Sequence, residues 1–176
     1  MGRDDAVALC SAGYALGYVV GDIEDGDAMI DSALKLNPNL ASAWYLSGWL
    51  KVWLGEPDVA IERIGRALRL SPLDPYTFFM QSATAYAHFI AGRYAEAASW
   101  AEAALRDRPD HLSGLRVLAA SSAMLGLQEQ AGKAMKRIRE LDPILRLSNL
   151  GYVSPLRQAE HRAKLAEGLK KAGLPE

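Results

Sequence analysis

The sequence predicts an all-α solenoid of about four helix hairpins, followed by a C-terminal capping helix. Three observations lead to this fold class: a phrase that recurs with a period close to 34 residues, a proline that ends each phrase, and a glycine midway through it. The prolines are Pro38, Pro72, Pro109 and Pro143, at intervals of 34, 37 and 34 residues. A constant period of roughly 20–50 residues is typical of repeat proteins, in which each unit buries its apolar face against its neighbours.

Each unit is expected to hold two helices joined by a tight turn. The expected helix pairs are 4–20 with 23–37, 41–54 with 57–71, 75–91 with 94–107, and 111–125 with 128–141. A glycine ends the first helix of each pair because it accepts the left-handed conformation; these are Gly21, Gly55, Gly92 and Gly126. A proline ends the second helix because it cannot continue one. The units are therefore 4–38, 41–72, 75–109 and 111–143.

The third unit is three residues longer than its neighbours, with the extra residues near Asp74 to Thr77. The repeat register returns at Gly92, so the insertion falls before or at the start of the unit's first helix. We expect it to lengthen that helix or the loop before it.

The second unit shows which repeat this is. Its residues Trp44, Gly48, Ala60, Ile64, Ala67 and Pro72 stand at the spacings of the tetratricopeptide (TPR) repeat. Ser47 and Lys51 depart from that pattern, where Leu and Tyr are usual. The chain thus resembles TPR proteins. The resemblance implies a right-handed superhelix in which the first helix of each pair lines a concave surface, and a role in protein–protein interaction.

Residues 144–176 are expected to form a linker and a capping helix that begins at Ser154-Pro155 and ends near Ala172. One apolar and one charged face suit the end of a solenoid. No comparable cap precedes helix 4–20, which is apolar on more than one side. We therefore expect that the chain is a piece of a longer protein; the alternative is a degenerate first unit that caps itself or dimerises.

Composition narrows the function class. A net charge of -1 gives no overall attraction to nucleic acid or anionic membrane. Residues 1–72 carry 6 basic and 10 acidic side chains, whereas residues 129–176 carry 10 basic and 6 acidic ones. This difference between the two ends is either ordinary surface variation or a basis for head-to-tail contacts between copies. The single cysteine, Cys10, excludes an internal disulfide framework, and the start of the sequence has no signal-peptide pattern. We expect a cytoplasmic protein without a membrane span.

No catalytic motif is present, so we expect a chain that is not an enzyme and holds neither a cofactor nor a metal. The three histidines are far apart in sequence, and His88 lies in an apolar helix, where packing is a better explanation than ligation. The acidic run from Asp22 to Asp31 lacks the ligand spacing of a calcium loop and suits the start of a helix instead.

The expected concave groove is the candidate binding site. Its predicted residues, mostly aromatic, are Tyr18, Tyr45, Trp49, Trp53, Phe79, Tyr86, Phe89, Arg116 and Met124. Aromatic anchors in a concavity dominate many binding interfaces. The alternative is that tight curvature, or the last helix folding back, buries these side chains as core. Only Arg116 and Lys51 are basic near this surface, so an extended or helical apolar segment is a better partner than a C-terminal carboxylate.

A narrower resemblance covers nearly the whole chain from Ala6. The runs from Arg69 to Pro75, from Tyr86 to Ala97, from Ser99 to Arg106 and from Glu167 to Glu176 are similar to the C-terminal TPR region of bacterial class III adenylate/guanylate cyclases. This resemblance implies a regulatory module within a cyclase, without any cyclase catalytic residue in this chain. Three functions stay open: a module that binds a protein segment or its own chain, a self-association module, and a small-ligand sensor with a Tyr45–Trp49–Tyr86 pocket.

Overall fold

A computed structural model describes residues 5–154 and 156–176, and every regular element in this part of the chain is helical. The helices of the repeats are α1 (Ala6–Ala15), α2 (Ile23–Leu36), α3 (Ala41–Leu54), α4 (Pro57–Leu70), α5 (Thr77–Ile90), α6 (Tyr94–Asp107), α7 (Leu112–Met124) and α8 (Gln128–Leu141). Two short turns of helix, η2 (Leu147–Asn149) and α9 (Leu150–Val153), precede the last helix, α10 (Ala159–Lys171).

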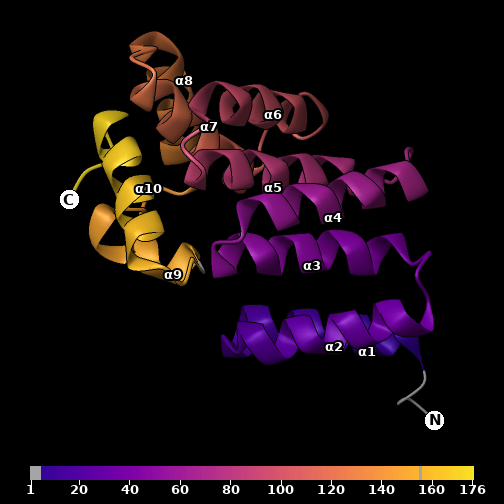
Figure 1. The fold of residues 1–176 in the computed structure, drawn as a ribbon. Helices are drawn as coiled ribbons and strands as arrows, with labels where there is room; N and C mark the ends of the chain where they lie inside the picture. Colours follow the sequence, from indigo (N-terminus) through magenta and orange to yellow (C-terminus); the bar gives the residue numbers. More distant parts are fainter. Residues whose placement is uncertain (1–4, 155) are drawn as a thin grey trace.

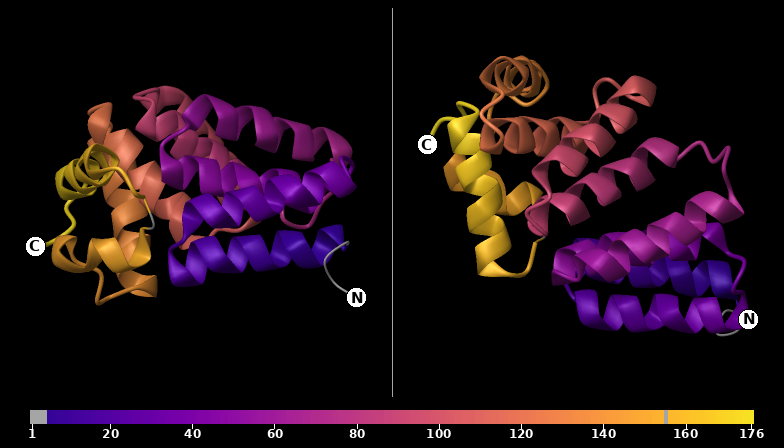
Figure 2. Two further views of the ribbon diagram at one scale, coloured as in Figure 1. Left: turned by 60° about the horizontal axis from the view of Figure 1, so that its bottom comes forward. Right: turned by 45° about the horizontal axis from the view of Figure 1, so that its top comes forward.

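The helices form antiparallel hairpins that stack in chain order (Figure 1). Each helix of α1 to α8 packs against the next one, and α1, α3, α5 and α7 also contact one another in sequence along one side of the stack. We call these four the inner helices. The turned views show the stack curving from the first hairpin to the last (Figure 2). The predicted fold class, an all-α solenoid of helix hairpins, is confirmed.

The first hairpin departs from the expected single helix 4–20. Asp5 caps α1, its side chain accepting hydrogen bonds from the backbone amides of Val7 and Ala8 at 2.9 and 3.2 Å, while residue 4 lies outside the described part. After Ala15 the chain widens into a π-helical turn, η1 (Leu16–Val20), which Gly21 ends at φ +86°. π-Turns of this kind are rare and lie frequently at functional sites.

Small residues set how closely the first hairpin packs. A Cβ atom placed on Gly13 would lie 2.5 Å from the carbonyl oxygen of Gly26, closer than any real Cβ contact. The backbones of α1 and α2 therefore meet at a distance that only glycine permits at this position.

The extra residues of the third unit lie in the loop between α4 and α5, which spans residues 71–76. Asp74 organises this loop: its side chain accepts from the amide of Tyr76 at 2.9 Å, and its carbonyl accepts from the Thr77 hydroxyl at 2.6 Å. The insertion thus lengthens the loop, and α5 keeps the same 14-residue length as α3.

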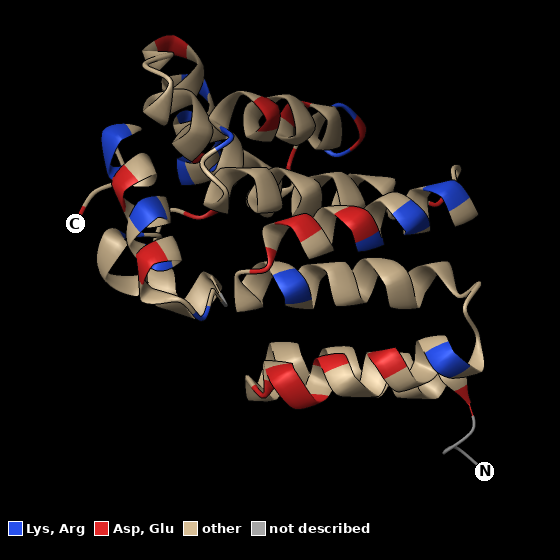
Figure 3. Ribbon diagram, in the orientation of Figure 1, with Lys and Arg blue, Asp and Glu red and all other residues tan. Residues whose placement is uncertain are grey.

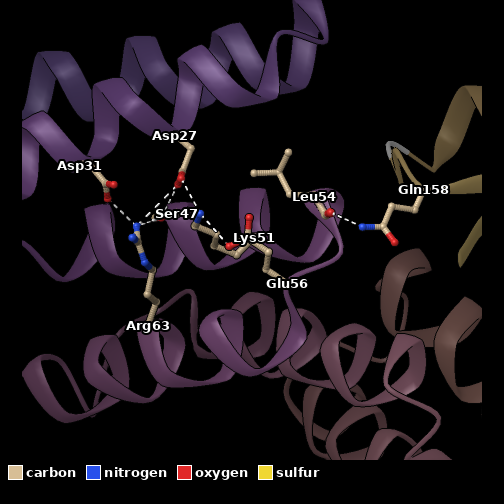
Figure 4. A network of polar contacts seen from close by, with 8 residues as sticks. All are labelled: Asp27, Asp31, Ser47, Lys51, Leu54, Glu56, Arg63 and Gln158. Atoms are coloured by element: carbon tan, nitrogen blue, oxygen red, sulfur yellow. Dashed lines mark hydrogen bonds and ion pairs between the residues drawn. The ribbon is translucent and has the colours of Figure 1, made fainter.

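A buried polar network joins the first two hairpins (Figure 4). Asp27 of α2, 6% exposed, accepts a hydrogen bond from Ser47 at 2.7 Å and pairs with Lys51 at 2.9 Å. Lys51 also pairs with Glu56 at 2.9 Å, and Arg63 pairs with Asp31 at 2.6 Å. The sequence pattern places Lys51 near the concave surface. The structure instead pairs it with Asp27 and Glu56 in this network. The two departures from the repeat pattern, Ser47 and Lys51, are both explained by their contact with Asp27.

The C-terminal residues also differ from expectation. The last helix begins at Ala159, not at residue 154, and Pro155 lies outside the described residues. It does not stack on α8 as one more layer. It crosses the C-terminal ends of the inner helices and packs against α7 and α5 (Figure 1). We call residues 150–154 and 156–176 the C-terminal segment.

Hydrogen bonds to the ends of the inner helices explain this position. The last carbonyls of a helix lack partners within it, and the C-terminal segment supplies donors to them. Gln158 donates to the carbonyl of Leu54 at 2.9 Å, and Lys164 donates to the carbonyl of Ile90 at 2.8 Å. The apolar face of α10, with Leu165 fully buried, faces the inner helices. As predicted, this helix also carries charged residues, and both basic and acidic ones are seen along α10 in Figure 3.

Candidate functional site

The inner helices and the C-terminal segment enclose a cavity of about 310 Å³. Each of the four inner helices contributes to it, counting η1 as the continuation of α1, and the C-terminal segment forms one wall. The lining residues are Tyr14, Tyr18, Trp49, Trp53, Phe79, Tyr86, Ser113, Arg116, Tyr152, Val153, Ser154 and Leu156.

Trp49 is the centre of the aromatic lining. Its ring centroid lies 4.9 Å from that of Phe79, 5.8 Å from that of Tyr86 and 6.1 Å from that of Trp53. Trp53 in turn lies 5.7 Å from Tyr18 of η1. Tilted arrangements at these distances are favourable for aromatic pairs. Rings from three successive hairpins thus form one continuous apolar surface.

The polar side of the cavity carries one cation. Arg116 of α7 is 7% exposed and donates to the Asp142 carboxylate at 3.2 Å. Burial raises the pKa of Tyr86, although the charge of Arg116 opposes this shift. Burial also raises the pKa of Tyr14. These hydroxyls therefore stay protonated near neutral pH, and Arg116 is the charged group in the lining.

The structure brings six of the nine predicted groove residues together in this lining: Tyr18, Trp49, Trp53, Phe79, Tyr86 and Arg116. Tyr45 lies beside them, with its ring edge-on to Phe79 at 6.1 Å, and its 9% exposure makes it part of the wall behind the cavity. Burial raises the pKa of Tyr45 to about 12, and the negative charge of Asp74 adds to this shift.

Phe89 and Met124 lie away from the cavity. Phe89 is fully buried and packs against Tyr94 of α6 at 5.4 Å, so it fills the seam within the third hairpin. Met124 ends α7, where its sulfur lies 3.8 Å from the Lys171 ammonium of α10. Helical spacing alone places both residues in the groove, but it does not show that Phe89 packs against α6 or that Met124 lies beside α10.

Six lining residues are not among the nine predicted groove residues: Tyr14, Ser113, Tyr152, Val153, Ser154 and Leu156. Tyr14 stands four positions before Tyr18 and stacks on it at 5.8 Å, a spacing that could have identified it. Tyr152, Val153, Ser154 and Leu156 belong to the C-terminal segment, and no repeat pattern predicts that this segment folds back.

The aromatic residues are largely buried, and a cavity lies among them. Trp49, Trp53 and Tyr86 are only 4–7% exposed, as expected for residues covered by a folded-back segment. A cavity nevertheless remains between them. Its mouth is apolar: Tyr18 is 60% exposed and Tyr152 is 93% exposed, and Val19 and Val20 extend this surface along η1.

Other candidate sites have structural explanations. His88 accepts a hydrogen bond from the Arg93 guanidinium at 3.0 Å, which agrees with a packing role. His161 is 7% exposed and lies against Gly55 at the end of α3. Within residues 5–154 and 156–176, no cluster of His, Cys, Asp and Glu has the arrangement of a metal site. In the same part of the chain, no helix combines the length and the apolar character that a membrane crossing requires.

No protein-family model matches the sequence, and no curated protein matches it. Among solved structures, the chain is similar to YrrB, described as a TPR protein with an unusual peptide-binding site, with 21% identity over 97% of this chain and 86% of YrrB, and a TM-score of 0.63. It is also similar to MamA, with 18% identity over 98% of this chain and 91% of MamA, and a TM-score of 0.65.

A third similar structure is PilW, described as a widely conserved type IV pilus biogenesis factor. It shares 16% identity over 95% of this chain and 77% of PilW, with a TM-score of 0.73. At these identities the similarity concerns the fold, which is that of a TPR superhelix, as the repeat spacing predicted.

Proposed function

We propose that this chain is a protein-interaction module whose cavity binds a segment of another protein. The observation that carries the proposal is the combination of an enclosed aromatic cavity and an exposed apolar mouth. A small molecule would fill the cavity alone and leave Tyr18, Val19 and Tyr152 in water. A longer partner segment covers the mouth as well and so removes more apolar surface from water. YrrB, with the same fold, is itself described by a peptide-binding site.

The test is selection from a displayed library of random peptides, with binding then measured by fluorescence anisotropy. Tyr18→Ala and Tyr152→Ala remove exposed lining side chains, so neither substitution creates a buried cavity, and each is expected to weaken binding about tenfold. Tyr76→Ala is the matched control, because Tyr76 is also exposed, at 54%, and does not line the cavity. Equal binding by all three variants would refute the proposal.

The parent protein is a further part of the proposal. The similarity of four sequence runs to the C-terminal TPR region of class III cyclases supports a module of four units, 4–38, 41–72, 75–109 and 111–143, that regulates a nucleotide cyclase domain elsewhere in a longer chain. The isolated module then makes no cyclic nucleotide, and the coding sequence of its gene reads into a cyclase domain. A gene that encodes these 176 residues alone would contradict this part.

Self-association is the second candidate function, and one observation favours it. The face of α1 that points away from α2 is exposed and apolar, with Val7 at 56% exposure and Val19 at 78% in the following turn. A second copy that covers this face would dimerise any attached domain. Sedimentation equilibrium tests this: a dimer that Val7→Lys dissociates supports it, and the mass of one chain at high concentration contradicts it.

A further inference from the structure

Two hydrogen-bond donors of the cavity lining lack an acceptor. The indole nitrogen of Trp49 and the Nε atom of Arg116 are buried without a partner, and both side chains line the cavity. They belong to the same cluster, since Tyr86 packs against Trp49 at 5.8 Å and its pKa responds to the charge of Arg116. Buried donors are nearly always paired in proteins. An acceptor brought by a ligand would remove the cost of leaving these two unpaired.

The charges around the cavity indicate an uncharged ligand. Arg116 disfavours a cation. Its charge is already balanced by Asp142, at 3.2 Å, whose side chain is 17% exposed. No carboxylate is among the lining residues that the structure describes. A ligand carboxylate would therefore add an unbalanced negative charge to a largely buried site, which is costly. A carbonyl oxygen accepts the same hydrogen bonds without that charge.

The size of the cavity indicates an extended segment. A volume of about 310 Å³ holds one or two side chains. An α-helix with its side chains is about 10 Å wide, and its carbonyls, apart from those of the last turn, are already bonded to its own amides. An extended chain leaves its carbonyls free and directs alternate side chains to one face. It can therefore place an apolar side chain in the cavity and a carbonyl at each donor.

We propose that the cavity binds an extended, uncharged, apolar segment of a partner protein, whose main-chain carbonyl oxygens accept hydrogen bonds from Trp49 Nε1 and Arg116 Nε. This inference rests on the proposed function and specifies its ligand. Both nitrogens are buried in the unliganded chain, so binding includes a displacement of the side chains that cover them. Among the lining residues of the C-terminal segment, Tyr152 and Val153 are the most exposed, at 93% and 39%, so their displacement breaks the fewest contacts.

The test uses peptides selected from the displayed library, synthesised with acetylated and amidated ends. Each backbone amide is replaced in turn by an ester, whose carbonyl is a weaker acceptor. With the unmodified protein, esters at one or two positions should weaken binding about fivefold. Trp49→Phe removes one donor and keeps a ring, so one of these ester effects should disappear. Arg116→Lys keeps the cation next to Asp142 but lacks Nε, so it should abolish the other.

Trp53→Phe is the matched control. Trp53 lines the same cavity at 4% exposure, and its indole nitrogen is not among the buried atoms without a partner, so both ester effects should persist in this variant. Ester effects that persist in Trp49→Phe and Arg116→Lys would overturn the inference. So would tighter binding by a hydrocarbon-stapled helical peptide, or by a peptide with a free terminal carboxylate. If instead no selected peptide depends on Tyr18 or Tyr152, the proposed function itself fails.

Discussion

The contact between Gly13 and Gly26 gives the sharpest prediction for stability. In Gly13→Ala the new Cβ would lie 2.5 Å from the Gly26 carbonyl oxygen and 3.0 Å from side-chain atoms of Met29 and Ile30. Carbon–oxygen contacts across helices are normally about 3.3 Å or longer, so α1 and α2 must separate by about 0.8 Å at this point. The oxygen belongs to the backbone and cannot rotate away.

The magnitude follows from two opposing terms. Overpacking of this kind costs about 1–3 kcal/mol, and a backbone contact favours the upper end. Replacing glycine with alanine inside a helix contributes about 1 kcal/mol in the other direction. We expect Gly13→Ala to lower the free energy of unfolding by about 2 kcal/mol. Gly132→Ala is the control: Gly132 lies within α8 with no atom within 4 Å of its added Cβ, so only the stabilising term remains.

The assay is urea denaturation followed by circular dichroism, with the slope of the transition checked to be unchanged. The two variants carry the same chemical change and should shift the midpoint in opposite directions. A Gly13→Ala variant as stable as the unmodified chain would refute the close approach of α1 and α2. Equal destabilisation by both substitutions would refute the argument from local space.

Three other perturbations have defined outcomes. Asp27→Ala should lower the free energy of unfolding by about 2–3 kcal/mol, because it removes a buried carboxylate and leaves Lys51, whose side chain is 13% exposed, short of one partner. Lys133→Ala, at an exposed position, should leave the urea midpoint unchanged. Lys164→Met should leave the Ile90 carbonyl without its donor and so increase hydrogen exchange in α10, and unchanged exchange would count against the observed position of that helix. Burial lowers the pKa of His161 below its ordinary 6.5; the charge of Glu160 opposes this shift and that of Lys164 adds to it. The stability that this shift contributes is present above pH 6.5 and should be lost as the pH falls toward the pKa of the folded state. His161→Gln should therefore reduce the slope of the unfolding free energy against pH, measured by urea denaturation.

The repeats could be predicted because local features determine them. A proline at the end of each unit and a glycine between its helices fix where helices end, whatever packs on them later. The aromatic lining could be predicted for the same reason: Trp49 and Trp53 are four residues apart and fall on one helical face. Once the hairpins stack, that face is shared with Phe79 and Tyr86 of the next inner helix.

The position of the C-terminal segment could not be predicted in this way. Its apolar face fits the end of a solenoid as well as its inner side, since both offer apolar surface. What decides between them is the pairing of Gln158 and Lys164 with the carbonyls of Leu54 and Ile90, over 104 and 74 residues of sequence. The prediction for Phe89 was wrong because helical spacing does not show that its ring is buried against Tyr94 of α6.

The most direct test of the binding cavity uses the four tryptophans as local reporters. Trp49 and Trp53 line the cavity, Trp44 donates its indole N–H to the Pro38 carbonyl at 2.8 Å, and Trp100 lies on α6. In a nitrogen–proton correlation spectrum each indole N–H gives one signal. Titration with a selected peptide should shift the Trp49 and Trp53 signals and leave those of Trp44 and Trp100 in place. Shifts confined to Trp44 or Trp100 would place the peptide elsewhere and contradict the account.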